Sequence, residues 1–186
     1  RRQRQMCIRD RYIIIIIRKE NCMTKKERAE LVIDGLAECY PDVKCALVYK
    51  KPHELLIATR LSAQCTDKRV NMVTPALFEK FPDIDSFAAA EPDEVAEYIH
   101  SCGLYKTKAV DIVMMCRMLR DDFGGEIPDT IEQLVKLPGV GRKTANLIVG
   151  DLYGKPALVC DTHVIRVSGR LGPVSYTHLR AHETLA

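Results

Sequence analysis

The sequence has no segment that is long and apolar enough to cross a membrane. Its longest apolar run, the isoleucines at 13–17, is far shorter than the roughly 20 apolar residues that a bilayer requires. The run also lacks a signal-peptide cleavage pattern, so no secretion signal is recognised. We therefore expect a cytoplasmic protein with no membrane partner.

Paired cysteines are missing as well, although the chain has 8 cysteines. None of them forms a C-x-x-C motif, so no metal framework is visible and we assign no metal ligands. Without a secretion signal, we interpret these residues as reduced thiols that pack as small hydrophobic side chains.

Strand-like alternation of apolar and polar residues is absent, and so are repeats. Apolar residues instead recur at helical spacing. The sequence therefore predicts an all-α protein. The first helix follows a capping box formed by Thr24 and Glu27. The expected helices are 24–38, 53–64, 67–81, 93–102, 106–123, 130–137, 142–153 and a last one that begins at Asp161.

The two ends of the chain do not resemble protein. Residues 6–10 (MCIRD) and 174–178 (VSYTH) can be encoded by the two strands of one inverted DNA repeat. Adapters ligated to both ends of a DNA fragment explain this more simply than protein selection, although a basic arm and tail without fixed structure remain an alternative. We therefore expect residues 1–22 and 174–186 to be non-native, Met23 to be the start, and the native part to be cut off at Pro173.

The positive net charge of the chain disappears once these two ends are set aside. The formal net charge of +3 divides into +5 for residues 1–22, −2 for residues 23–172 and 0 for the tail. A nucleic-acid function therefore has to rest on local sites and not on net charge. About 150 native residues are enough for one domain with a real core.

The stretch LPGVGRKTAN at 137–146 predicts a tight turn between two helices. Gly139 and Gly141 flank Val140, and both glycines are expected to allow positive φ and a close approach of a ligand to the backbone. Amides at the start of the second helix, near Arg142, would suit a phosphate. A plain helix connection is the alternative.

Lys143 stands at an unfavourable place, because a cation at a helix N-terminus costs up to about 1 kcal/mol. The helix start and Arg142 disfavour its charged form, which favours a nucleophilic amine. The apolar stripe of this helix is Ala145, Ile148, Val149 and Leu152. Lys143 lies opposite the stripe, on a face that resembles the wall of a cleft.

Asp161 stands where a helix N-cap is expected, before Val164. It is either only a cap or a carboxylate that is fixed by its cap bonds and acts with Lys143.

Four separated motifs together resemble the endonuclease III family of the helix–hairpin–helix DNA glycosylase superfamily: ELLIATRLSAQCTD at 54–67, CGLYKTKA at 102–109, LPGVGRKTAN at 137–146 and DTHV at 161–164. The resemblance implies a DNA glycosylase and abasic-site lyase that acts on oxidised pyrimidines in double-stranded DNA, as a monomer. By this resemblance Lys143 is the nucleophile and Asp161 the catalytic carboxylate. Gln64 and Leu104 correspond to side chains that enter the duplex. His163 is a candidate for contact with the DNA backbone, and the alternative is an early-helix residue with no assigned role.

The resemblance also implies a fold of two lobes: a six-helix barrel over 45–157, with the hairpin at 130–153, and an incomplete second lobe from 23–44 and 158–173. The family carries a [4Fe–4S] cluster on cysteines beyond the point where this chain stops, so we expect no cluster ligands here and a weakly active or inactive fragment.

Three other functions stay open. Adenine glycosylases of the superfamily generally lack a lysine at this position, so Lys143 disfavours them. A lysine-dependent 8-oxoguanine glycosylase is not excluded. A helix–hairpin–helix module that only binds DNA would need neither Lys143 nor Asp161.

Overall fold

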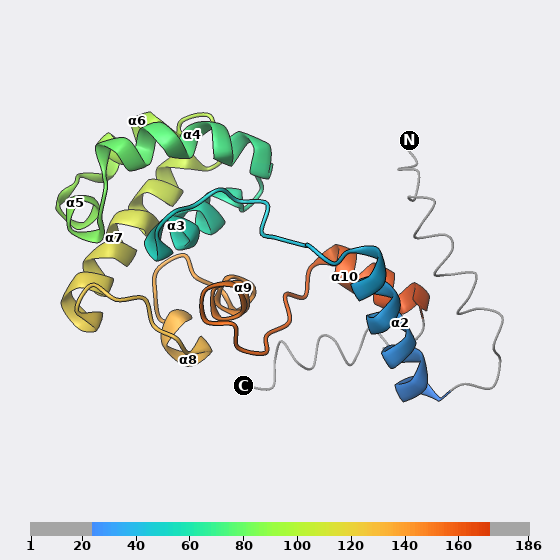
Figure 1. Cartoon of the computed structure of the whole chain (residues 1–186). Coiled ribbons are helices and arrows are strands. Elements are labelled where there is room, and N and C mark those ends of the chain that lie inside the picture. The colour runs from blue at the N-terminus through green and yellow to red at the C-terminus, as the bar shows by residue number, and fades with distance from the viewer. Residues whose placement is uncertain (1–23, 172–186) are drawn as a thin grey trace. The chain divides into compact units, whose positions relative to one another are not determined.

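The computed structural model describes residues 24–171, which form two compact units. One unit is Cys45–Val159, and the other joins residues 24–44 to residues 160–171. Within this described range every regular element is a helix (Figure 1). None of the described helices is sufficiently long and apolar to span a bilayer. The segments 1–22 and 174–186, interpreted as non-native, and Met23 lie outside the described residues.

Seven helices make up the larger unit: α3 (Pro52–Ser62), α4 (Asp67–Lys80), α5 (Ile84–Ala89), α6 (Pro92–Ile99), α7 (Tyr105–Phe123), α8 (Ile131–Leu134) and α9 (Arg142–Tyr153). The long helix α7 packs mainly against α5 and α6, while α3 contacts α4, α7 and α9. The all-α prediction is therefore confirmed for the described residues.

Helix α3 is the centre of the core. Leu55, Leu56, Ile57 and Leu61 are fully buried, so both sides of this helix are covered by protein. Removing such side chains from water is the main source of stability in a domain of this size. The end of α3 at Ser62 is thereby held rigidly, and the loop that follows it starts from a fixed point.

The expected helices differ from the observed ones in four places. Helix α3 ends at Ser62 instead of running to Gln64. Helix α5 was not expected, because six residues are too few to give a periodic signal. Helix α6 ends at Ile99 instead of running to Cys102, and the amide of Cys102 donates to the Ile99 carbonyl (2.8 Å) in a turn. Helix α8 is four residues long instead of filling 130–137, since turn hydrogen bonds replace helical ones before Pro138.

The smaller unit contains α2 (Lys25–Cys39) and α10 (Thr162–Leu171). The predicted capping box is present: the Glu27 amide donates to Thr24 Oγ1 (3.3 Å), and the Thr24 amide donates to Glu27 Oε2 (2.7 Å). Glu27 Oε2 accepts from the Thr24 amide and also from the Thr24 hydroxyl (2.8 Å), and these two bonds lower the pKa of Glu27. Helical spacing predicts an apolar stripe of Ala29, Val32, Ile33 and Leu36 on α2. Of these residues only Val32 is buried, whereas Ile33 is 64% exposed and Leu36 is 42% exposed.

Candidate active site

The turn at residues 138–141, which we call the hairpin turn, connects α8 to α9. Its Val140 side chain is buried (6% exposed), while Gly139 and Gly141 on either side are exposed. The amide of Val140 donates to the Leu137 carbonyl (3.1 Å) and closes the turn. The buried Val140 side chain therefore anchors the turn in the core, and the two glycines beside it remain exposed.

Gly139 is required by both conformation and space. Its φ is +72°, a region that side chains with a Cβ rarely adopt. A Cβ at this position would also lie 2.6 Å from Arg60 Nε and 3.0 Å from Asp111 Cβ. Arg60 Nε donates to Asp111 Oδ2 (2.9 Å), which makes an ion pair between α3 and α7. The hairpin turn packs against this ion pair at Gly139.

Gly141 has a different role from the one that the sequence predicted. Its φ is −92° and its ψ is 172°, so the expectation of positive φ is wrong for this glycine. A Cβ at Gly141 would meet nothing within 4 Å. It is the N-cap of α9 and gives that helix no side-chain cap. The start of α9 is thus open to an anion, as a phosphate site at a helix N-terminus requires.

Lys143 is the second residue of α9, and it is exposed. Three residues of the predicted apolar stripe of this helix, Ala145, Ile148 and Val149, are buried as expected. One turn after Lys143, Leu147 begins a hollow of about 460 Å³ that is also lined by Gly150, Asp151 and residues 154–157. Lys143 does not line this hollow, so the cleft beside Lys143 stays a prediction.

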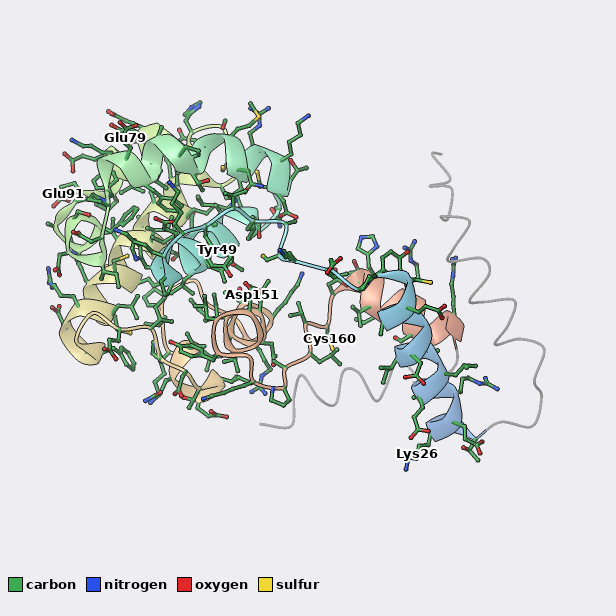
Figure 2. All side chains as sticks on the ribbon, viewed as in Figure 1. Lys26, Tyr49, Glu79, Glu91, Asp151 and Cys160 are labelled. Carbon is green, nitrogen blue, oxygen red and sulfur yellow. The ribbon has the colours of Figure 1, made fainter. Side chains whose placement is uncertain are left out.

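Asp151 lies in that hollow and was not found by sequence reasoning. The Tyr49 hydroxyl donates to Asp151 Oδ2 (2.6 Å), and the two side chains meet beside α9 (Figure 2). This hydrogen bond is the main reason that the pKa of Tyr49 is raised to about 12. Helical spacing places Asp151 four residues after Leu147 on the same face, which is the signal that could have revealed it.

Asp161 is the N-cap of α10. Its Oδ1 accepts from the Val164 amide (2.7 Å), and its carbonyl accepts from the Ile165 amide (3.0 Å). Asp161 belongs to the smaller unit and Lys143 to the larger one, so the pairing of these two side chains stays a prediction. His163 is exposed in the first turn of α10, with its Nδ1 3.2 Å from the guanidinium of Arg166.

Gln64 and Leu104 share an unusual backbone. Within residues 24–171 they are the only non-glycine residues with positive φ, at 54° and 58°. Both are exposed, and Leu104 retains 62% of its accessible surface. A Cβ on Gly103 would lie 3.7 Å from the Gln64 carbonyl oxygen, so the two loops are neighbours. Strained backbone of this kind gathers at functional sites.

The described cysteines do not fit an iron–sulfur cluster. The six described cysteines are Cys39, Cys45, Cys65, Cys102, Cys116 and Cys160, and no group of three or more candidate metal ligands occurs within residues 24–171. Burial raises the pKa of Cys102 to about 11 and that of Cys116 to about 12, whereas cluster ligands must be thiolates.

Known proteins resemble the chain in both sequence and structure. The family model described as HhH-GPD superfamily base excision DNA repair protein matches residues 57–185. Endonuclease III of Synechocystis sp. is 47% identical over 150 residues, which cover 80% of this chain and 68% of that protein.

Two solved structures are similar throughout the fold. A non-covalent endonuclease III–DNA complex matches with a TM-score of 0.79 and 45% identity, over 87% of this chain and 76% of the other. A trapped endonuclease III–DNA covalent intermediate matches with a TM-score of 0.73 and 48% identity, over 78% of this chain and 68% of the other.

Proposed function

Because the chain belongs to the endonuclease III family of the HhH-GPD superfamily base excision DNA repair proteins, we propose that it is a DNA glycosylase with abasic-site lyase activity on oxidised pyrimidines. The observation that carries this proposal is an exposed lysine, Lys143, in the first turn of the helix that follows the hairpin turn. An exposed amine at this place can reach a sugar whose phosphate is bound at the hairpin.

The damaged nucleotide must leave the base stack before an amine can reach its sugar. Lys143 Nζ then forms a bond to C1′, while the bond between C1′ and the base nitrogen breaks and its electron pair leaves with the base. The departing base takes up a proton. The role proposed for Asp161 is to stabilise the positive character of the sugar or to take part in this proton transfer.

Strand cleavage follows from the bond that Lys143 has formed. Ring opening breaks the C1′–O4′ bond while the nitrogen lone pair forms a C1′=N iminium, and O4′ takes up the proton that the amine loses. Removal of a proton from C2′ sends the C–H electron pair to the iminium and gives an enamine. The enamine electrons return to form a C2′–C3′ double bond and expel the 3′ phosphate by β-elimination. Hydrolysis of the iminium then returns Lys143 as a free amine.

The hairpin turn supplies phosphate binding in this proposal. Support comes from the exposed backbone at Gly139 and Gly141, from the buried anchor Val140, and from the cation Arg142 at the start of α9. Because the Val140 side chain is buried, its contribution to DNA binding is that of its backbone. Phosphate contacts of this kind position the duplex without reading its sequence.

Gln64 and Leu104 are proposed to occupy the space that the flipped nucleotide vacates. Gln64 offers a donor and an acceptor to the unpaired partner base, and Leu104 separates the adjacent base step as an apolar wedge. Their exposure supports these roles, since neither side chain is used in the core.

The proposal is tested with duplexes that carry thymine glycol, 8-oxoguanine opposite cytosine, or adenine opposite 8-oxoguanine. Base release and strand cleavage are measured for the protein and for Lys143→Gln, whose exposed site should tolerate the change. We expect thymine glycol to be processed fastest, with both activities lost in Lys143→Gln and duplex affinity kept within about threefold. A preference for 8-oxoguanine would overturn the lesion assignment, and base release by the variant would overturn the nucleophile.

A further inference from the structure

Lys108 is a fully buried cation that neither the hairpin turn nor the lysine nucleophile requires. It lies in the first turn of α7 with 0% of its surface exposed. A buried ammonium is unfavourable unless its charge is compensated by hydrogen bonds or opposing dipoles. Its presence in the core therefore calls for a specific interaction.

That interaction is with the end of α3. Lys108 Nζ donates to the Leu61 carbonyl oxygen (2.8 Å), which belongs to the last turn of the helix. The C-terminal end of a helix carries partial negative charge and unpaired carbonyls, so it suits a cation. Neighbouring carbonyls are satisfied locally: that of Thr59 by the Ser62 hydroxyl (2.9 Å) and that of Ser62 by the Cys65 amide (3.0 Å).

The backbone of the same residue holds the other loop. The Lys108 amide donates to the Leu104 carbonyl oxygen (3.0 Å), and Leu104 is the positive-φ residue at which α7 begins. The side chain of Lys108 therefore hydrogen-bonds to Leu61, three positions before Gln64. The backbone amide of Lys108 hydrogen-bonds to Leu104. One residue connects both strained loops.

The groups that surround the Lys108 ammonium come from both loops, the one that contains Gln64 and the one that contains Leu104. Burial lowers the pKa of Lys108, the Cys102 and Cys65 thiols oppose this, and Arg60 adds to the lowering. Cys65 follows Gln64 and Cys102 precedes Gly103, so each loop contributes one thiol to the surroundings of the ammonium. The Gly103–Gln64 approach, with a Cβ-to-oxygen distance of 3.7 Å, is a part of the same contact.

We propose that Lys108 is the positioning residue that fixes the spacing between Gln64 and Leu104, so that both side chains enter a damaged duplex together. The inference rests on the proposed function of those two residues. An apolar side chain could fill the same volume and keep the core packed. It could not donate a hydrogen bond to the Leu61 carbonyl. It therefore could not hold the start of the loop that contains Gln64 at a fixed distance from α7.

The experiment compares Lys108→Met with Ile112→Val, a change at another fully buried residue of α7. The probe is a duplex in which a tetrahydrofuran abasic analogue faces 2-aminopurine. The affinity of each variant for this duplex and the change in 2-aminopurine fluorescence on binding are measured. The affinity of each variant for the undamaged duplex is measured as well. The same changes are made in the Gln64→Ala, Leu104→Ala background, and melting temperatures are recorded for every variant.

We expect Lys108→Met to weaken binding of the abasic duplex by about tenfold, a factor that corresponds to about 1.4 kcal/mol, with the fluorescence change reduced and undamaged binding within about twofold. In the Gln64→Ala, Leu104→Ala background the further loss should be under about twofold, because the residues through which Lys108 acts are gone. Ile112→Val should change neither affinity. Lys108→Leu, which also lacks a donor, serves as the second variant if Lys108→Met melts below the assay temperature.

Equal losses for abasic and undamaged duplexes, or the same loss in both backgrounds, would show that Lys108 only supports the fold. If the Gln64→Ala, Leu104→Ala change weakens abasic binding but Lys108→Met and Lys108→Leu do not, the inference fails and the proposed function stands. If the Gln64→Ala, Leu104→Ala change has no effect, both fail.

Discussion

At the scale of single residues, the two glycines of the hairpin turn solve different problems. Gly139 has a positive φ and no room for a Cβ beside Arg60 and Asp111. Gly141 has ordinary dihedral angles and open space around it, so the fold does not require a glycine there. In the proposed function, the paired glycines therefore combine a folding requirement at Gly139 with a phosphate-binding requirement at Gly141.

Substitution of the two glycines by alanine should separate these requirements. Gly139→Ala should lower the free energy of unfolding by about 1–3 kcal/mol, since φ strain and the contact with Arg60 add. Gly141→Ala should change stability by less than about 1 kcal/mol yet weaken duplex binding by about tenfold, because its methyl group blocks a phosphate. Denaturant unfolding and fluorescence anisotropy measure the two quantities. Similar stability losses in both variants would contradict the distinction.

Asp161 can be tested without loss of its cap. Asparagine caps helices as well as aspartate does, so Asp161→Asn should keep the melting temperature within about 2 °C. Single-turnover base excision should nevertheless fall by about 10²-fold, as expected when a charged group near the reacting sugar is neutralised. Asp161→Ala is the control that loses both the cap and the charge. Full activity in Asp161→Asn would show that the residue is only a cap.

At the scale of elements, a hydrogen bond connects α9 to the segment before α3. The Tyr49 hydroxyl donates to Asp151, and the pKa of Tyr49 is raised to about 12 from its ordinary value of 10.0. A raised pKa means that the folded state favours the neutral phenol. The resulting stability is complete below pH 10 and is lost as the pH rises from 10 to about 12.

Tyr49→Phe should therefore lower the free energy of unfolding by about 0.5–1 kcal/mol at pH 8, a value reduced by solvent screening. The difference from the unsubstituted protein should shrink as the pH rises above 10. Urea unfolding at several pH values measures it. Tyr98→Phe, at a tyrosine that is 37% exposed and packs its ring against Phe81, is the matched control. A Tyr49→Phe difference that stays constant up to pH 12 would contradict this assignment.

Sequence reasoning succeeded for elements whose signals are local. The stripe of α9, the capping box of α2 and the stop of α7 at Gly124 each depend on residues a few positions apart. It missed what depends on distant pairs: the Lys108–Leu61 contact joins positions 47 residues apart, and the Arg60–Asp111 pair spans 51. Periodicity carries no information about such contacts, since it describes one helix at a time.

At the scale of the whole molecule, the division into two units has a consequence for folding. The main hydrophobic core extends from Leu47 to Val149 and lies wholly within Cys45–Val159. A fragment of this length buries enough apolar surface to be stable by itself.

The isolated fragment Cys45–Val159 should therefore unfold cooperatively on heating, with a helical circular-dichroism spectrum and a melting temperature within about 10 °C of the whole chain. The unsubstituted chain is the reference in the same buffer. A fragment that loses ellipticity gradually, without a transition, would show that residues 24–44 and 160–171 are needed to complete the core.

The central claim is that Lys143 forms a covalent bond with the sugar, and borohydride trapping on abasic-site DNA tests it most directly. Reduction should link protein to DNA, peptide mapping should place the link on Lys143, and Lys143→Gln should give no product while it still binds the duplex. The nearby exposed Lys136 and Lys155, changed to glutamine, should leave trapping unchanged. A link that maps to another lysine, or undiminished trapping in Lys143→Gln, would contradict the account.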